Sequence, residues 1–308
     1  MADSYAALDC GTNSTRLLVS DGSGGPLVRE MRITRLGQGV DNTRQLRADS
    51  IERTLGALRE FRGLMDRQGV RRARLVATSA VRDARNGREF LAGASEVTGV
   101  EAELLSGEEE GRLSYRGAMA GLPAIPWPTV VVDIGGGSTE IVTSSDGSIR
   151  SVSLDIGCVR LTERFLAGDP PSADEVDAAT TAIAEQLQRA QREIPLLEHL
   201  PERARLVGLA GTVSTLAALE LGLGPAYDRD RVHHSVLTID AVTRWCDVLG
   251  GEQVATRAAR PAIPPGREDV IFGGALVLRE VMRTLRRDRC IVSESDILDG
   301  LVMSILPE

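Results

Sequence analysis

The chain contains no lysine, so all 36 of its basic residues are arginine. Walker-type phosphate loops and Schiff-base enzymes both depend on a lysine, and neither kind of site can therefore be present. Any grip on a phosphate group must come from arginine, hydroxyl groups, backbone N–H groups or a bound metal ion.

Cysteine and long apolar runs are also scarce. The four cysteines stand apart, without a CxxC pair or an adjacent histidine, which argues against a disulfide framework or a zinc site. We expect them to be small buried residues. No apolar run approaches the ~20 residues of a membrane helix, and the N-terminus does not resemble a signal peptide. We therefore expect a cytoplasmic protein with no membrane partner.

The formal net charge of −8 disfavours a nucleic-acid partner, because such proteins need a basic face to replace counterions. A length of 308 residues with 42% hydrophobic residues indicates a globular protein of two domains. The proline-dense stretch 121–128 predicts their junction. We expect an N-terminal domain over residues 1–125 and a C-terminal domain over residues 126–308.

A glycine-rich stretch, 133–140, lies between two strand-like segments, 129–132 and 141–143. Gly135, Gly136 and Gly137 allow backbone N–H groups to converge on an anion, and Ser138 follows them. Asp133 and Glu140 place carboxylates at both ends of the turn, where a hydrated divalent cation is readily held. An ordinary glycine-rich hairpin is the alternative interpretation.

The same motif occurs near the N-terminus, at a constant offset of 133 − 9 = 124 residues. Four positions match in order: Asp9, Gly11, Ser14 and Thr15 correspond to Asp133, Gly135, Ser138 and Thr139. Thr12 and Asn13 complete the first turn, and Arg16 replaces Glu140. Two such turns can clamp one anionic ligand in a cleft between two domains, which strengthens the prediction of a phosphate and metal site.

Two further candidates lie between these turns. Arg82 follows a short buried strand, 75–78, at the end where α/β sheets bind ligands, although an ordinary surface arginine fits the sequence as well. Glu108, Glu109 and Glu110 open a predicted helix. They are interpreted either as partners of the helix dipole or as the source of a general base.

The C-terminal half offers a third glycine-rich turn at Gly211-Thr212, which fits either a phosphate site or an ordinary pair of helix caps. Arg267 ends a proline-rich loop. The adjacent His233 and His234 are expected on a strand, pointing to opposite faces, and so do not predict a metal site. Helices are predicted over 50–67, after Asn86 and the capping box at 172–175, over 269–285 and over 297–305, the last one capped by segment 293–296.

Taken in order, these motifs resemble the exopolyphosphatase and guanosine pentaphosphate phosphohydrolase family. They are Asp9-x-Gly-Thr-Asn-Ser, Ala77-Thr78-Ser79-Ala80-Val81-Arg82, Ser106-Gly107-x-Glu109-Glu110, the stretch Asp133 to Glu140, and Gly211-Thr212. The resemblance implies an α/β fold of two ribonuclease H-like, actin-like ATPase domains, with mixed sheets flanked by helices and the active site in a cleft between them. It also implies that the C-terminal helix, about 296–308, packs back on the first domain.

The resemblance further implies roles for individual residues. Glu110 is expected to be the general base, with Glu109 as the alternative because consecutive glutamates can shift an alignment. The phosphate-binding residues are expected to be Gly11, Thr12, Asn13, Ser14, Arg16, Arg82, Gly135, Gly136, Gly137, Ser138, Gly211, Thr212 and Arg267. Asp133, Glu140 and Asp9 are expected to hold Mg²⁺, or Mn²⁺ in its place.

We therefore expect a phosphoanhydride hydrolase, with polyphosphate or the stringent-response nucleotides guanosine penta- and tetraphosphate as ligands, acting as a homodimer. An ATP-dependent kinase of the same superfamily and a non-catalytic sensor of these ligands are the alternatives. Acidic side chains beside the ligand favour turnover, because a receptor for polyanions does not need them.

Overall fold

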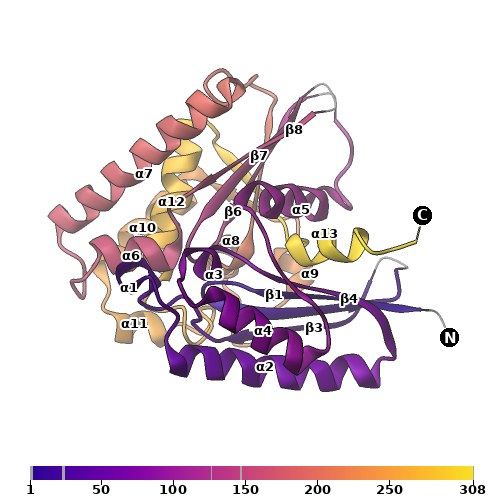
Figure 1. Cartoon of the computed structure of the whole chain (residues 1–308). Coiled ribbons are helices and arrows are strands. Elements are labelled where there is room, and N and C mark those ends of the chain that lie inside the picture. The colour runs from indigo at the N-terminus through magenta and orange to yellow at the C-terminus, as the bar shows by residue number, and fades with distance from the viewer. Residues whose placement is uncertain (1–2, 23–24, 126, 146–147, 308) are drawn as a thin grey trace. The chain divides into compact units, whose positions relative to one another are not determined.

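The structure, a computed structural model, describes residues 3–22, 25–125, 127–145 and 148–307. It divides into two compact units (Figure 1). Unit 1 comprises Met1–Met119 and Asp296–Glu308, and unit 2 comprises Ala120–Ser295. The C-terminal segment thus belongs to the first unit.

Unit 1 is built on a mixed sheet with the strand order β3-β2-β1-β4-β5. Strands β1, β2 and β3 pair antiparallel, whereas β4 and β5 run parallel to β1. The strands are β1 (Ser4–Cys10), β2 (Ser14–Ser20), β3 (Pro26–Ile33), β4 (Val70–Ala77) and β5 (Ala102–Leu104).

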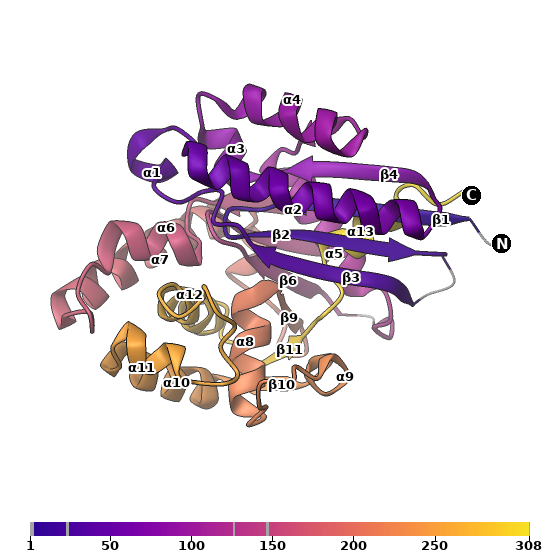
Figure 2. The ribbon, with the colours of Figure 1, turned by 90° about the horizontal axis from the view of Figure 1, so that it is seen from below.

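Helices cover both faces of this sheet, because alternate side chains of each strand point in opposite directions. Ala6 and Leu8 pack in one cluster with Phe61 and Phe90, whereas Tyr5 and Ala7 pack in another with residues of the C-terminal helix. The helices of unit 1 are α1 (Val40–Thr43), α2 (Ala48–Arg67), α3 (Ser79–Asp83), α4 (Gly87–Thr98), α5 (Gly107–Met119) and α13 (Ile297–Met303). Helices α2 and α4 lie side by side over the first face (Figure 2).

Unit 2 repeats this arrangement with the strand order β10-β11-β9-β6-β7-β8. Its strands are β6 (Thr129–Ile134), β7 (Thr139–Ser145), β8 (Ser148–Leu154), β9 (Arg205–Leu209), β10 (Val236–Thr238) and β11 (Arg289–Val292). Strands β6, β7 and β8 pair antiparallel, and β9 and β11 are parallel to β6, as β4 and β5 are to β1. The duplication inferred from two short motifs therefore extends to a whole sheet, and the prediction of an α/β fold with two mixed sheets flanked by helices is confirmed.

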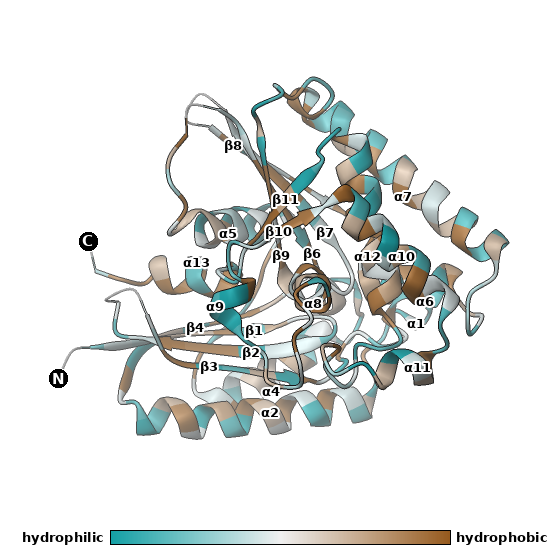
Figure 3. Cartoon of the chain, turned by 180° about the vertical axis from the view of Figure 1, so that it is seen from behind, coloured by the Kyte–Doolittle hydropathy of each residue, from teal (hydrophilic) through white to brown (hydrophobic). Residues whose placement is uncertain are grey.

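The helices of unit 2 are α6 (Cys158–Phe165), α7 (Ala173–Glu193), α8 (Ala210–Glu220), α9 (Arg229–Val232), α10 (Ile239–Gly251), α11 (Val254–Ala258) and α12 (Ile271–Thr284), with a 3₁₀ turn η1 (Pro195–Leu197). Ser172 and Glu175 form the predicted capping box of α7. Apolar and polar residues alternate along α2 and α7 (Figure 3), as expected of helices with one face on a core.

Two local predictions were wrong. Asn86 precedes α4, but its side chain makes no cap; it bonds instead to the N–H and C=O groups of Leu46, at 2.9 and 3.0 Å. His233 and His234 follow the short helix α9 and lie on no strand, and their rings stack with centroids 3.7 Å apart. The Asn86 side chain bonds to a residue 40 positions away, and a local sequence pattern cannot indicate such a contact.

All four cysteines are buried and free. Within the described residues, no helix is both long and apolar enough to cross a membrane.

Candidate active site

The two repeated motifs form the same hairpin. In the first, the Gly11 N–H group donates to the Ser14 carbonyl at 3.0 Å; in the second, Gly135 donates to Ser138, also at 3.0 Å. A Cβ atom on either glycine would lie only 3.1 Å from that carbonyl oxygen, so a larger residue would crowd both turns in the same way. The repeat predicted from the sequence is therefore a repeat of geometry.

In unit 1, the loop after β3 holds the carbonyl groups of the first turn. Thr12 accepts from the Gly37 N–H group at 2.8 Å, and Asn13 accepts from Thr34 and Arg35 at 3.1 and 3.0 Å. The C=O of one residue and the N–H of the next point in opposite directions across a trans peptide. The N–H groups of Asn13 and Ser14 consequently point away from this loop.

In unit 2, the start of α6 plays the same part. The carbonyl of Gly135 accepts from Cys158, that of Gly136 from Val159, and that of Gly137 from the Arg160 side chain at 2.6 Å. By the same peptide geometry, three successive N–H groups, of residues 136 to 138, point to the opposite side. Converging N–H groups of this kind suit an anion.

The acidic residue at the start of each hairpin faces the residue that differs between the copies. Asp9 is opposite Arg16, and Asp133 is opposite Glu140. The Arg16 side chain donates to Oδ2 of Asp9 from Nη2 at 2.6 Å and from Nε at 3.1 Å, and also forms an ion pair with Asp296. Burial raises the pKa of Asp9 above its usual range, and the Arg16 guanidinium opposes that shift.

Glu140 is almost fully buried, at 1% exposure, and its Oε1 accepts a hydrogen bond of 2.7 Å from the Ser153 hydroxyl on β8. Asp133, on the neighbouring strand, is 7% exposed. Carboxylates held this firmly at a strand end suit a hydrated cation better than a direct role as base, which needs freedom to reach water.

The two candidate bases have different surroundings. Glu110 lies in the first turn of α5, and its Oε2 lies 3.4 Å from Nη1 of Arg82, with 12% of the glutamate side chain exposed. Arg82 is fixed by a 2.9 Å hydrogen bond to the Leu105 carbonyl. It lies one turn of α3 after Ser79, whose hydroxyl is 2.9 Å from that of Thr12 in the first glycine turn. Helix α3 thereby connects the pair of Glu110 and Arg82 with that turn.

Glu109 points elsewhere. Its side chain is 50% exposed and lies 3.6 Å from Arg74, which is itself held by Glu103 at 2.7 Å. A half-exposed carboxylate that faces Arg74 on β4 is poorly placed to meet a ligand at the first glycine turn.

The third glycine-rich turn also gathers its predicted residues. Arg267 lies directly over Gly211, because a Cβ atom there would meet the guanidinium at 1.6 Å, and its Nη1 is 3.5 Å from the Thr215 hydroxyl. Thr212 packs against Gly274 of α12. Leu209, at the end of the adjacent strand, pairs in register with Asp133, so this turn adjoins the second of the two repeated turns.

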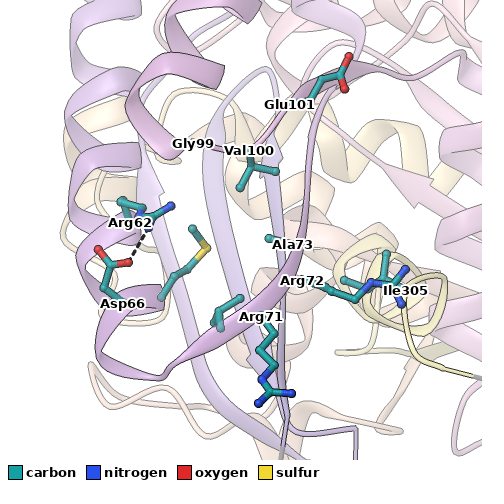
Figure 4. Close-up of a pocket in the computed structure, with 11 residues that line it drawn as sticks. Arg62, Asp66, Arg71, Arg72, Ala73, Gly99, Val100, Glu101 and Ile305 are labelled. Carbon is teal, nitrogen blue, oxygen red and sulfur yellow. Dashed lines mark ion pairs between the residues drawn. The ribbon is translucent and has the colours of Figure 1, made fainter.

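A cavity of about 440 Å³ in unit 1 involves none of these residues (Figure 4). It is lined by Arg62, Met65, Asp66, Val70, Arg71, Arg72, Ala73, Gly99, Val100, Glu101 and Ile305. Val70 begins β4, whereas Ala77 at the end of that strand pairs with Cys10 beside the first turn. The cavity therefore lies at the opposite end of the sheet, roughly 20 Å away along the strand.

One specific observation supports a divalent cation at Asp9. In the part of the chain that the structure describes, Oδ1 of Asp9 is buried and has no hydrogen-bond partner. A buried carboxylate oxygen needs a partner, and water bound to a cation would supply it. Among the described residues, no group of three acidic, histidine or cysteine side chains is arranged to hold a metal ion, so Mg²⁺ at Asp9 would depend on waters and substrate phosphates for its other ligands.

No sequence motif pointed to several of the residues at the candidate site. Asp296 contacts Arg16 across 280 positions, and Ser153 contacts Glu140 across a sheet. Asp296 was predicted only as part of a helix cap, a local role that it also fills by accepting from the Leu298 N–H group at 2.9 Å. Arg160 is buried behind the second turn without any motif to mark it.

Several known proteins are similar to this chain over nearly its whole length. Exopolyphosphatase 2 of Mycobacterium tuberculosis is 45% identical over 317 residues, covering 97% of this chain and 98% of the relative. A crystal structure of an exopolyphosphatase-like protein aligns with a TM-score of 0.91 and 35% identity, covering 97% of this chain and 98% of that one. An Aquifex aeolicus member of the Ppx/GppA protein family aligns with a TM-score of 0.80 and 33% identity, covering 98% and 97%. The model of the Ppx/GppA phosphatase family matches residues 18–308, and the chain therefore belongs to that family.

Proposed function

We propose that this protein hydrolyses the terminal phosphoanhydride bond of inorganic polyphosphate, and that guanosine pentaphosphate is a second substrate. The observation that carries the proposal is the 3.4 Å pair of Glu110 with Arg82, on the short helix whose Ser79 hydroxyl lies 2.9 Å from that of Thr12 in the first turn. A carboxylate and a guanidinium together can hold a water molecule next to a bound phosphoryl group. The names of the relatives, exopolyphosphatase among them, support the same substrate class.

In the proposed reaction, Glu110 accepts a proton from water as the water oxygen attacks the terminal phosphorus. The bond between that phosphorus and the bridging oxygen breaks, which releases orthophosphate and a chain shorter by one unit. Arg82 and the N–H groups of the turns stabilise the charge on the phosphoryl oxygens. Asp9 in unit 1, and separately Asp133 and Glu140 in unit 2, are the carboxylates proposed to hold Mg²⁺ or Mn²⁺, which would supply further positive charge to the phosphates when bound. We further expect a cytoplasmic homodimer.

Exchange of Glu110 for glutamine tests this assignment. Glu110→Gln keeps the shape but removes the base, so we expect kcat on short polyphosphate with Mg²⁺ to fall about 10²- to 10⁴-fold, with KM little changed. Glu109→Gln is the matched control and should retain nearly full activity, because that side chain faces Arg74. Unchanged phosphate release by Glu110→Gln, or a collapse confined to Glu109→Gln, would contradict the proposal.

Substrate preference is measured separately. Values of kcat/KM on short polyphosphate, long polyphosphate and guanosine pentaphosphate, taken side by side, would rank the three. Phosphate transfer to an acceptor other than water would instead show a kinase.

A further inference from the structure

The C-terminal helix α13 brings a carboxylate into the first half of the site. Asp296 caps this helix, and its Oδ2 pairs with Nη1 of Arg16 on β2. Both residues belong to unit 1, although 280 positions separate them. Arg16 thus lies between two carboxylates, those of Asp9 and Asp296.

The way in which Arg16 binds Asp9 is unusual. An arginine normally pairs with both oxygens of a carboxylate through two parallel hydrogen bonds. Here Nε and Nη2 both donate to the single oxygen Oδ2, and Oδ1 is left buried with no hydrogen-bond partner among the described residues. Asp296 binds the opposite corner of the same planar guanidinium, which holds it away from Oδ1.

The surrounding charges keep Asp296 in place. Arg29 on β3 lies 3.8 Å from its Oδ1 and pairs with Asp299, on the same helix, at 2.7 Å. Oδ1 also accepts the Leu298 N–H group at 2.9 Å. With both oxygens engaged, Asp296 is a fixed anchor for Arg16.

We propose that Asp296 is a positioning residue of the reaction: through Arg16, it orients Asp9 so that Oδ1 remains free for the hydrated divalent cation. This inference rests on the proposed function. It gives Arg16 a task other than gripping phosphate, since its guanidinium orients a carboxylate. It also makes the last helix part of the site, in addition to its part in the core.

The variant Asp296→Asn tests the proposal. Asparagine caps helices as well as aspartate does, so α13 should keep its cap while the charge that holds Arg16 is lost. Arg16 can then pair with both oxygens of Asp9 and cover Oδ1. Outer residues that orient metal ligands typically contribute 10- to 100-fold in metal affinity, so we expect the Kd for Mn²⁺, measured by electron paramagnetic resonance, to rise by about that factor.

Asp299→Asn is the matched control. It removes a carboxylate of the same helix that pairs with Arg29 and not with Arg16, so Mn²⁺ affinity should stay close to that of the wild type. Asp296→Glu, which restores the charge, should recover part of the affinity. Arg16→Gln should weaken Mn²⁺ binding as Asp296→Asn does, and the double variant should be no worse than either single one, because both changes act on one contact.

The outcomes are separable from those of the proposed function. Equal Mn²⁺ affinity of the wild type and Asp296→Asn would overturn the inference, as would an equal loss in Asp299→Asn, which would indicate a purely structural role. A wild-type protein that binds Mn²⁺ but releases no phosphate from polyphosphate would overturn the proposed function alone. Additive losses in the double variant would also count against the inference.

Discussion

At the scale of single residues, burial and partners decide roles that residue type leaves open. Glu109 and Glu110 are chemically identical neighbours, yet one is 50% exposed beside Arg74 and the other is 12% exposed beside Arg82. One step along a helix turns a side chain by about 100°, which is enough to send adjacent glutamates to different surroundings. The sequence could therefore name the pair of candidates but could not choose between them.

The cysteines of unit 2 provide a prediction at this scale. Burial raises the pKa of Cys158 to about 11, and those of Cys246 and Cys290 to about 12, from an ordinary value of 9.0. The folded pKa values are the higher ones, so this contribution to stability is complete below pH 9 and is lost as pH rises through about 11 to 12. Urea denaturation at a series of pH values should show the unfolding free energy of unit 2 falling above pH 9.

Cys246→Ala is the control for that decline. The variant removes one of the three thiols, so its unfolding free energy should fall less steeply with alkaline pH than that of the wild type. A decline of equal slope in both proteins would show that other groups cause it.

At the scale of elements, glycines set how closely two helices approach. Helices α5 and α13 pack at a point where a Cβ atom on Gly117 would lie 1.8 Å from the Asp296 carbonyl oxygen. From the other side, a Cβ on Gly300 would lie 2.1 Å from the carbonyl of Leu113. This close crossing places the first residue of the helix cap, Asp296, next to the sheet.

Gly117→Ala should destabilise unit 1 by about 1–3 kcal/mol or more, because the backbone of α13 must move to admit a methyl group. Gly56→Ala is the contrasting variant. It lies within α2 with nothing in 4 Å of its Cβ position, so alanine there should stabilise the protein by about 0.5–1 kcal/mol. Urea denaturation measures the unfolding free energy of both variants. A lower unfolding free energy in both of them would refute the packing argument.

At the scale of the whole molecule, unit 1 is completed by the two ends of the chain. Residues of α13 form one apolar cluster with β1 and α5, including Leu301, Val302, Tyr5 and Leu113. One face of the first sheet is therefore covered only after the last residues have been added, and the folding of unit 1 depends on a contact between segments far apart in sequence.

Leu301→Ala tests this dependence. The side chain is fully buried, so its truncation should cost unit 1 about 2–5 kcal/mol. Met303 is 47% exposed on the same helix, and Met303→Ala should cost little. Amide hydrogen exchange should show faster opening of β1 in the first variant, with β6 in unit 2 unchanged. Equal protection of β1 in both variants would show that α13 does not support the first sheet.

The sequence by itself determined the features that depend on residues close together in the chain. The two glycine turns, their offset of 124 residues, the amphipathic helix near residues 50–67 and the cap at Ser172 all follow from spacing and residue type, and the structure contains each of them. Backbone geometry and side-chain periodicity act over a few residues, so these features can be predicted from short stretches of sequence.

Only the tertiary structure decided which distant side chains meet. Asp296 with Arg16, Arg267 over Gly211, Ser153 with Glu140, and Asn86 turned away from its own helix toward Leu46 are contacts between separate segments. Such pairs have no period and no fixed spacing, because the packing of sheets and helices brings them together. The same packing places Glu110 beside Arg82 and leaves Glu109 half-exposed beside Arg74.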